Sequence, residues 1–111
     1  MEQLVYLSLL FDFYGALLTD KQKESLLLHL FEDFSLAEVG DALGISRQAV
    51  YDNIRRAELS MKDYEKKLGL LSRYQEERTA LGEIASRIEK LRTVENGDAI
   101  DTILKRMAPL M

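Results

Sequence analysis

The chain has 111 residues, of which 47% are hydrophobic, and it carries a net charge of −4. This length suits one domain with one core, and this composition excludes an intrinsically disordered chain. Because cysteine is absent, disulfides, thiolate metal sites and cysteine nucleophiles are excluded as well, and the low proline and glycine content predicts an all-α fold.

Residues 2–17 are predicted to form a helix that is apolar nearly all round, with a thin polar line at Ser8, Asp12 and Gly15. Such a helix lies either inside a core or against a second chain, and we favour the core. Asp12 and the acidic Glu2 argue against a membrane span and a signal peptide, so we expect a soluble cytoplasmic protein without membrane insertion.

The next predicted helix starts with Thr19-Asp20-Lys21-Gln22, a capping-box pattern. We expect it to run to about Phe34. Its lone histidine, His29, has no neighbouring ligand residue, so a place at the surface or core edge is favoured over a functional role. Its expected buried stripe contains Leu26, Leu27, Leu30, Phe31 and Phe34.

A second capping box, Ser35-Leu36-Ala37-Glu38, opens a short predicted helix that ends near Leu43 and buries Leu36, Val39 and Leu43. Gly44 supplies the left-handed conformation of a tight turn, and Ser46 caps the helix that follows. A short capped helix joined in this way to a second, longer capped helix is typical of a helix-turn-helix. We place that motif at about residues 35–60.

The helix that begins at Arg47 is predicted to be long, and Gly69 either ends or kinks it. Its expected inner stripe contains Val50, Ile54, Ala57, Met61, Tyr64 and Leu68. Residues 61–108 then form a C-terminal helical extension of a single domain over residues 1–111.

The extension contains two further predicted helices. The first covers about residues 70–92, and the second is capped by Asp98 after an Asn96-Gly97 turn and stopped by Pro109. Elongated helices with an apolar stripe favour pairing of two chains over folding back on their own core, so a homodimer is expected. The stripe of the first helix contains Leu71, Tyr74, Leu81, Ile84, Ile88 and Leu91.

Polar residues at the start of the second motif helix are the candidate DNA-binding residues, because the N-terminal turns of that helix face base edges when the motif docks. Arg47 is suited to a phosphate or guanine and Gln48 to adenine. The full set is Arg47, Gln48, Tyr51, Asp52, Arg55 and Arg56.

Charge is distributed unevenly. Residues 1–43 carry two lysines against eight acidic residues, whereas residues 44–67 carry six basic residues against four acidic ones. Arg55 and Arg56 are suited to backbone phosphates, while Asp52 accepts from cytosine but repels phosphates. The alternative interpretation is that these side chains only solvate a helix.

No catalytic constellation, Gly-rich phosphate loop or metal-ligand spacing is visible, so we expect neither an enzyme nor a bound cofactor or metal.

The residues S-L-A-E-V-G-D-A-L-G-I-S followed by V-Y-D-N-I-R-R-A resemble region 4 of bacterial sigma factors, which reads an upstream promoter element. Tyr51 and Asp52 depart from the basic or amide residues that many sigma factors have there, and nothing resembles the sigma region that reads the second promoter element. A working sigma factor is therefore not expected.

Over nearly the whole chain, including the apolar start and L-T-D-K-Q, the sequence more closely resembles the YlxM family. These are small bacterial helix-turn-helix proteins whose gene typically lies beside that of the signal recognition particle GTPase. The resemblance implies an all-α fold and a link to that targeting pathway. The leading hypothesis is a DNA-binding regulator acting on double-stranded DNA. The alternative is a protein–protein adaptor of the signal recognition particle GTPase or its ribonucleoprotein.

Overall fold

The computed structural model describes residues 2–111, and from residue 3 onward it also describes the side chains. Helices are the only regular elements among these residues, so the predicted all-α fold without a β-wing is confirmed. No helix in this range combines the length and apolar character that crossing a membrane requires. The six α-helices are α1 (Glu2–Tyr14), α2 (Asp20–Leu26), α3 (Leu36–Leu43), α4 (Arg47–Leu68), α5 (Leu70–Lys90) and α6 (Gly97–Met107).

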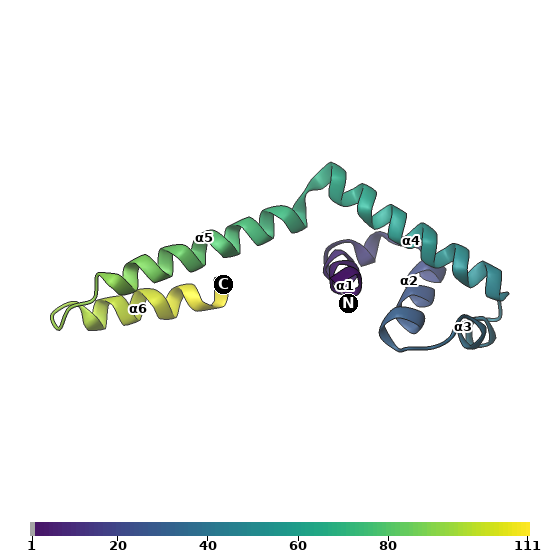
Figure 1. Cartoon of the computed structure of the whole chain (residues 1–111), viewed down its shortest axis with the longest axis horizontal. Helices are drawn as coiled ribbons and strands as arrows, with labels where there is room; N and C mark the ends of the chain where they lie inside the picture. The colour runs from purple at the N-terminus through teal and green to yellow at the C-terminus, as the bar shows by residue number, and fades with distance from the viewer. Residues whose placement is uncertain (1) are drawn as a thin grey trace. The chain divides into compact units, whose positions relative to one another are not determined.

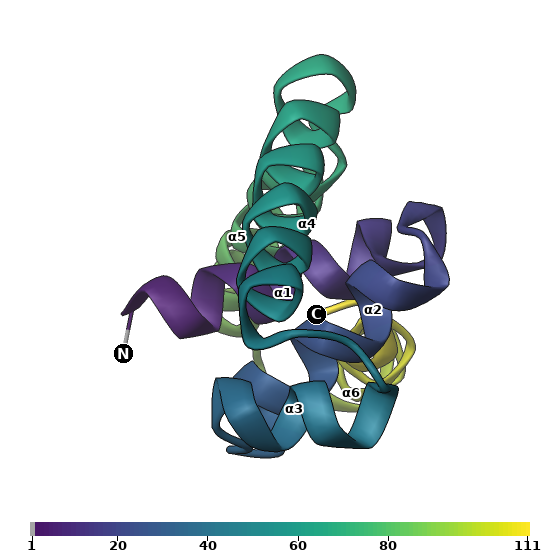
Figure 2. The ribbon, with the colours of Figure 1, turned by 90° about the vertical axis from the view of Figure 1, so that its right-hand side faces the viewer.

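The chain forms two compact units, Met1–Leu71 and Ser72–Met111. In the first unit, α4 packs against α1, α2 and α3, which lie side by side along it (Figures 1 and 2). This arrangement makes α4 the scaffold of the unit's core. That core contains Leu7, Leu10, Tyr14, Leu18, Leu26, Val39, Val50, Ile54, Ala57, Met61 and Leu71.

Helix α1 confirms the predicted apolar helix, although its last turn, Gly15–Leu17, is a 3₁₀ helix. Leu7, Leu10 and Tyr14 are spaced i, i+3, i+7 and are buried, so this face lies in the core. Val5 on the other side keeps 59% of its surface exposed. The expectation of a core helix is therefore right for one face, and the opposite apolar face remains at the surface.

Helix α2 is shorter than predicted. Its α-helical part ends at Leu26, and residues 27–31 form a π-helical turn in which the Glu32 N–H donates to the Leu27 carbonyl at 3.0 Å. Asp33 then adopts a left-handed φ of 63°, which stops the helix before Phe34. As a result Phe34, placed in the buried stripe by its spacing, is exposed.

Helix α4 ends where the sequence places Gly69, which has a left-handed φ of 63°. A polar network fixes this end. The Tyr14 hydroxyl donates to Glu65 Oε1 at 2.7 Å and accepts from the Leu70 N–H at 3.2 Å. Burial and the Glu65 carboxylate raise the pKa of Tyr14. Leu68 precedes this stop on the solvent side and is exposed, although its spacing extends the inner stripe.

The second unit contains α6 and the rest of α5, and it is a helical hairpin (Figure 1). Arg92 joins the two helices, because its guanidinium donates to Glu89 at 2.8 Å and to Asp101 at 2.7 Å. These two carboxylates raise its pKa. The predicted cap at Asp98 is wrong. The N-cap residue is Asn96, two residues earlier, and its side chain makes no capping bond to α6. It bonds back to the preceding turn instead, because the Thr93 N–H donates to Asn96 Oδ1 and the Asn96 N–H donates to Thr93 Oγ1.

Candidate nucleic-acid interface

Helices α3 and α4, joined by a turn at Gly44, are the two helices of the motif, and each begins with a cap. The Ser35 hydroxyl accepts from the Glu38 N–H, while the Glu38 carboxylate accepts from the Ser35 N–H at 3.0 Å. This bond to the backbone N–H lowers the pKa of Glu38. Gly44 has φ 68° and ψ 34°, and Ser46 accepts from the Ala49 N–H to start α4. Local capping therefore defines both helices of the motif.

Gly40 lets the two motif helices approach closely. A Cβ added at this position would lie 2.7 Å from the Ile45 carbonyl oxygen, closer than real Cβ atoms come to other atoms. The Ile45 N–H also donates to the Gly40 carbonyl at 3.0 Å. The turn is thus pressed against α3, and this contact sets the direction in which α4 leaves it.

Four of the predicted site residues share one exposed face of α4. Gln48, Tyr51, Asp52 and Arg55 follow the spacing i, i+3, i+4, i+7, and all four are exposed. This face lies opposite the buried stripe of Val50, Ile54, Ala57 and Met61. The orientation is the one a recognition helix needs, because the core holds one side while the other points to solvent.

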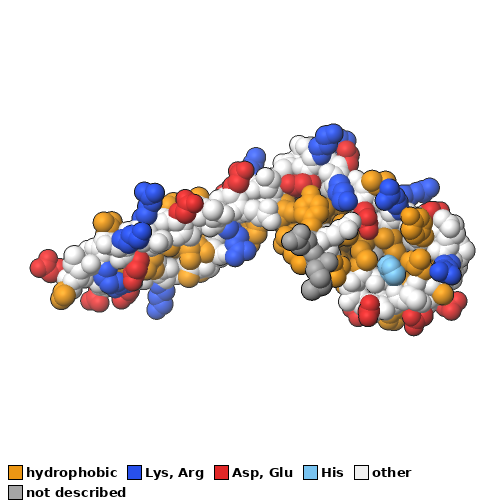
Figure 3. Space-filling view, in the orientation of Figure 1, with side chains coloured by type: hydrophobic (Ala, Val, Ile, Leu, Met, Phe, Trp, Pro, Cys, Tyr) orange, Lys and Arg blue, Asp and Glu red, His pale blue; other side chains and the backbone are white. Residues whose placement is uncertain are grey.

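The remaining two predicted residues border this face. At 100° per residue, Arg47 falls on one edge and Arg56 on the opposite edge. Among the side chains that the structure describes, no carboxylate pairs with Arg47, Arg55 or Arg56, and all three are exposed. Figure 3 shows Lys and Arg side chains along the upper edge of this unit, where α4 runs, with Asp and Glu side chains among them. The three guanidinium groups are therefore available to phosphate oxygens.

Asp52 is not free. The Gln48 side-chain amide donates to Asp52 Oδ1 at 3.1 Å, within one turn of α4. This bond uses one N–H of Gln48 and one carboxylate oxygen of Asp52. The face thus combines a glutamine–aspartate pair with the Tyr51 hydroxyl and the Arg55 guanidinium.

Sequence reasoning missed one residue of this surface. Leu36, which was assigned to the core by its spacing, is only half-buried and lines a hollow together with Arg47, Gln48 and Tyr51. The hollow depends on how α3 crosses α4, so no local signal in the sequence indicates it. Lys21 of α2 also lies at the turn, and its ammonium donates to the Leu43 carbonyl at 3.3 Å.

Nothing in the described part of the chain gathers three or more side chains that could hold a metal ion. The fold and this exposed helix face define an all-α helix-turn-helix protein.

The comparisons with known proteins identify the family. The family model described as "Putative helix-turn-helix protein, YlxM / p13 like" matches residues 1–101, and the chain belongs to this family, UPF0122. A UPF0122 protein of Thermoanaerobacter sp. is 44% identical over 107 residues, which cover 96% of this chain and 92% of the relative. One of Lacticaseibacillus casei is 48% identical over 100 residues, covering 89% and 86%. One of Shouchella clausii is 38% identical over 110 residues, covering 99% and 98%. The predicted YlxM resemblance is thereby confirmed.

Proposed function

We propose that this protein is a cytoplasmic regulator that binds double-stranded DNA through the N-terminal half of α4. The observation that carries the proposal is the exposed face of Gln48, Tyr51, Asp52 and Arg55, which lies opposite the buried stripe of a capped helix-turn-helix. In this family of motifs, that part of the second helix enters the major groove. The family description supports the same assignment.

Each side chain has a distinct expected role. Arg55 and Arg56 hold backbone phosphates and fix the register of the helix, which requires exposed, unpaired guanidinium groups. Gln48 and Arg47 stand nearest the N-terminus of α4 and contact base edges. Asp52 orients Gln48 through their hydrogen bond, so it limits the bases that the glutamine accepts.

Electrophoretic mobility shifts with a pool of random DNA duplexes at low salt test the proposal. We expect binding that weakens steeply with added salt, because phosphate contacts release counterions. Changing Arg47→Ala together with Gln48→Ala should weaken binding at least tenfold while far-UV circular dichroism remains unchanged.

Lys66→Ala is the matched control, because it also removes one exposed positive charge from α4 but lies far from the motif. Its affinity should stay within about twofold of the unaltered chain. An unaltered chain that shifts no duplex would overturn the proposal, and so would an equal loss in the Lys66→Ala and Arg47→Ala/Gln48→Ala proteins.

We further propose that the protein acts as a homodimer. Two copies bring two α4 N-termini to half-sites of one operator, which is how isolated helix-turn-helix modules commonly gain affinity and specificity. Sedimentation velocity at micromolar concentration measures this directly, and a monomer at every concentration would contradict it.

The second candidate function is a protein–protein adaptor of the signal recognition particle GTPase or its ribonucleoprotein, which the YlxM resemblance implies. The observation that favours it is the exposed apolar side of α1, where Leu4, Val5 and Tyr6 each keep between 39% and 59% of their surface accessible. The adaptor hypothesis predicts co-purification with the targeting GTPase that survives DNase. Val5→Glu should abolish that complex, and an unchanged complex would exclude α1 as the contact.

A further inference from the structure

The C-terminal hairpin lacks a core of its own. Among the described residues 72–111, Ile100 is the only buried side chain, with 4% of its surface exposed. Two helices with one buried side chain bury too little apolar surface to offset the chain entropy lost on folding. This unit also has no cysteine and, within the described residues, no cluster of metal ligands to compensate. Its apolar surface therefore needs a covering surface.

Four exposed apolar side chains of the hairpin lie on one side of it. Ile84 of α5 and Leu91, directly after α5, are one heptad apart, and Ile103 and Leu110 have the same spacing on α6 and the turn after it. Because the two helices are antiparallel, these flanks turn to the same side of the hairpin. We call these four side chains the hairpin face; they are 47%, 68%, 45% and 62% exposed, respectively.

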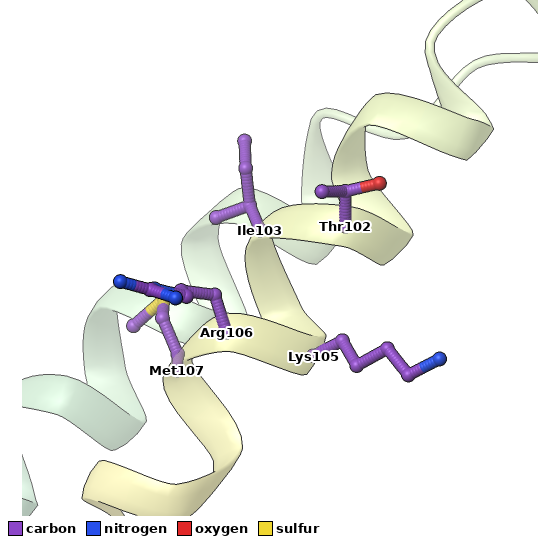
Figure 4. Close-up of a pocket in the computed structure, with 5 residues that line it drawn as sticks. All are labelled: Thr102, Ile103, Lys105, Arg106 and Met107. Atoms are coloured by element: carbon purple, nitrogen blue, oxygen red, sulfur yellow. The ribbon is translucent and has the colours of Figure 1, made fainter.

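The hairpin face is also hollowed. In Figure 4, Ile103 and Met107 project from one side of α6 with Arg106 beside Met107, and Lys105 projects to the other side. An open groove runs between these side chains. Figure 3 shows hydrophobic side chains along both helices of this unit. Thr102, Lys105 and Arg106 also line the groove, but most of its surface is apolar, so it accepts an apolar side chain of a facing helix, as holes do in helical bundles.

We infer that the hairpin face is the surface through which two copies of this chain associate, forming an antiparallel four-helix bundle from two hairpins. This inference names the interface of the proposed homodimer and rests on that part of the proposed function. Charge argues for a second copy as the occupant. Residues 72–111 carry seven basic and seven acidic residues, so two copies meet without net repulsion, whereas nucleic acid finds no basic field there.

The rim of the hairpin face is self-complementary. Glu77, Arg87 and Arg106 lie at its edge by helical spacing, and none of them has an ion-pair partner among the described side chains. An isologous contact brings each rim residue of one copy near the rim of the other, so Glu77 can pair with an arginine of the second copy. Such rim pairs set orientation and register more than affinity.

The exposed apolar area of the hairpin face is comparable with the apolar area that a typical homodimer interface takes from each partner. Taking roughly 180 Å² for one fully exposed large apolar side chain, the four residues of the hairpin face offer on the order of 400 Å². A typical homodimer interface takes about 800 Å² from each partner, of which about 65% is apolar. The hairpin face together with neighbouring half-buried side chains of α5 and α6 supplies that apolar share.

Sedimentation equilibrium of the full chain and of two variants tests the inference. Ile84→Glu places a carboxylate in the interface twice per dimer, and it should weaken association at least 100-fold. Ser86→Glu is the matched control, because it adds the same charge on the far side of α5 and should leave association unchanged. Circular dichroism of the same proteins reports whether dissociation also lowers the helicity of the hairpin, as its lack of a core predicts, and Ile103→Glu repeats the test from α6.

Each outcome of these experiments either supports or overturns the inference. A dimer that Ile84→Glu and Ile103→Glu dissociate, and that Ser86→Glu does not, supports the hairpin face. A dimer that both apolar-to-Glu variants retain overturns it and points to another surface, such as α1. A monomer at every concentration overturns the inference together with the proposed dimer, while mobility shifts with the same proteins report separately on DNA binding. Loss of helicity in both apolar variants of a monomer shows that the chain covers the face itself, which also overturns it.

Discussion

Gly40→Ala is the sharpest test of the motif geometry, because the space available at Gly40 is known. An alanine Cβ would lie 2.7 Å from the Ile45 carbonyl oxygen, which belongs to the backbone of the turn and cannot rotate away. The turn must shift, and the hydrogen bond from the Ile45 N–H to the Gly40 carbonyl is strained with it.

Two opposing effects set the size of the change. Overpacking costs about 1–3 kcal/mol, and weakening the Ile45 bond adds about 1 kcal/mol. Alanine returns up to about 1 kcal/mol of helix propensity relative to glycine. We therefore expect Gly40→Ala to lower the free energy of unfolding by about 1–3 kcal/mol, because backbone overlap outweighs propensity.

Gly82→Ala is the matched control for that experiment. Gly82 lies inside α5 with no atom within 4 Å of an added Cβ, so only propensity acts and stability should rise by about 0.5–1 kcal/mol. Urea unfolding followed by circular dichroism measures the free energy of unfolding of both variants. A Gly40→Ala protein as stable as the unaltered chain would refute the close approach of α3 and the turn.

Three further predictions concern stability. Tyr14→Phe should lower the free energy of unfolding in urea by about 2 kcal/mol, because it removes a buried hydroxyl bonded to the Glu65 carboxylate. Equal stability of the two proteins would show that this bond does not stabilise the fold. Because burial raises the pKa of Tyr14 above its ordinary value of 10.0, its contribution is present below pH 10 and is lost as pH rises further, which unfolding at high pH checks against the Tyr14→Phe protein. Ser35→Ala should cost about 1 kcal/mol at pH 7. Since the pKa of Glu38 is lowered from 4.5, that cost should shrink as pH falls through its folded pKa, and a cost unchanged at pH 3 would count against the capping box. Asp33→Gly should raise stability by about 0.5–1 kcal/mol in thermal unfolding, because glycine adopts the φ of 63° without strain.

The elements that the sequence predicts correctly are those specified by residues close together in the chain. Ser35 and Glu38 interact three residues apart, and Gly44 and Gly69 each need only their own backbone conformation. Such signals are readable in one sequence because no distant residue takes part in them. The start of α4 at Arg47 follows from them directly.

The predicted and observed helix ends differ where contacts beyond the immediate neighbours in the chain determine the backbone conformation. The π-helical turn at residues 27–31 lets α2 end early, and hydrophobic spacing alone predicts an ordinary helix through Phe34. Likewise, residue type alone favours Asp98 as a cap as much as Asn96, whereas α6 starts directly after Asn96, which bonds to Thr93 in the preceding turn.

In the candidate site, too, some features follow from the sequence and others depend on the packing of helices. The shared face of Gln48, Tyr51, Asp52 and Arg55 follows from helical spacing, and the Gln48–Asp52 bond is a contact that the i, i+4 rule permits. The hollow beside Leu36 depends on the crossing of α3 and α4, so it emerges only from the three-dimensional arrangement. Whether these residues contact DNA stays a prediction.

Helix α4 connects the candidate DNA-binding face near its N-terminus with the Tyr14–Glu65 hydrogen bond near its C-terminus. Its 22 residues span about 33 Å without a break, from the solvent-exposed glutamine and arginines of the motif to the buried Tyr14–Glu65 network. Because α4 is continuous and buries Val50, Ile54, Ala57 and Met61 along its length, the exposed residues of the motif and the Tyr14–Glu65 bond belong to one helix. A substitution at residue 65 therefore acts on the same element that presents Gln48 and the arginines to solvent.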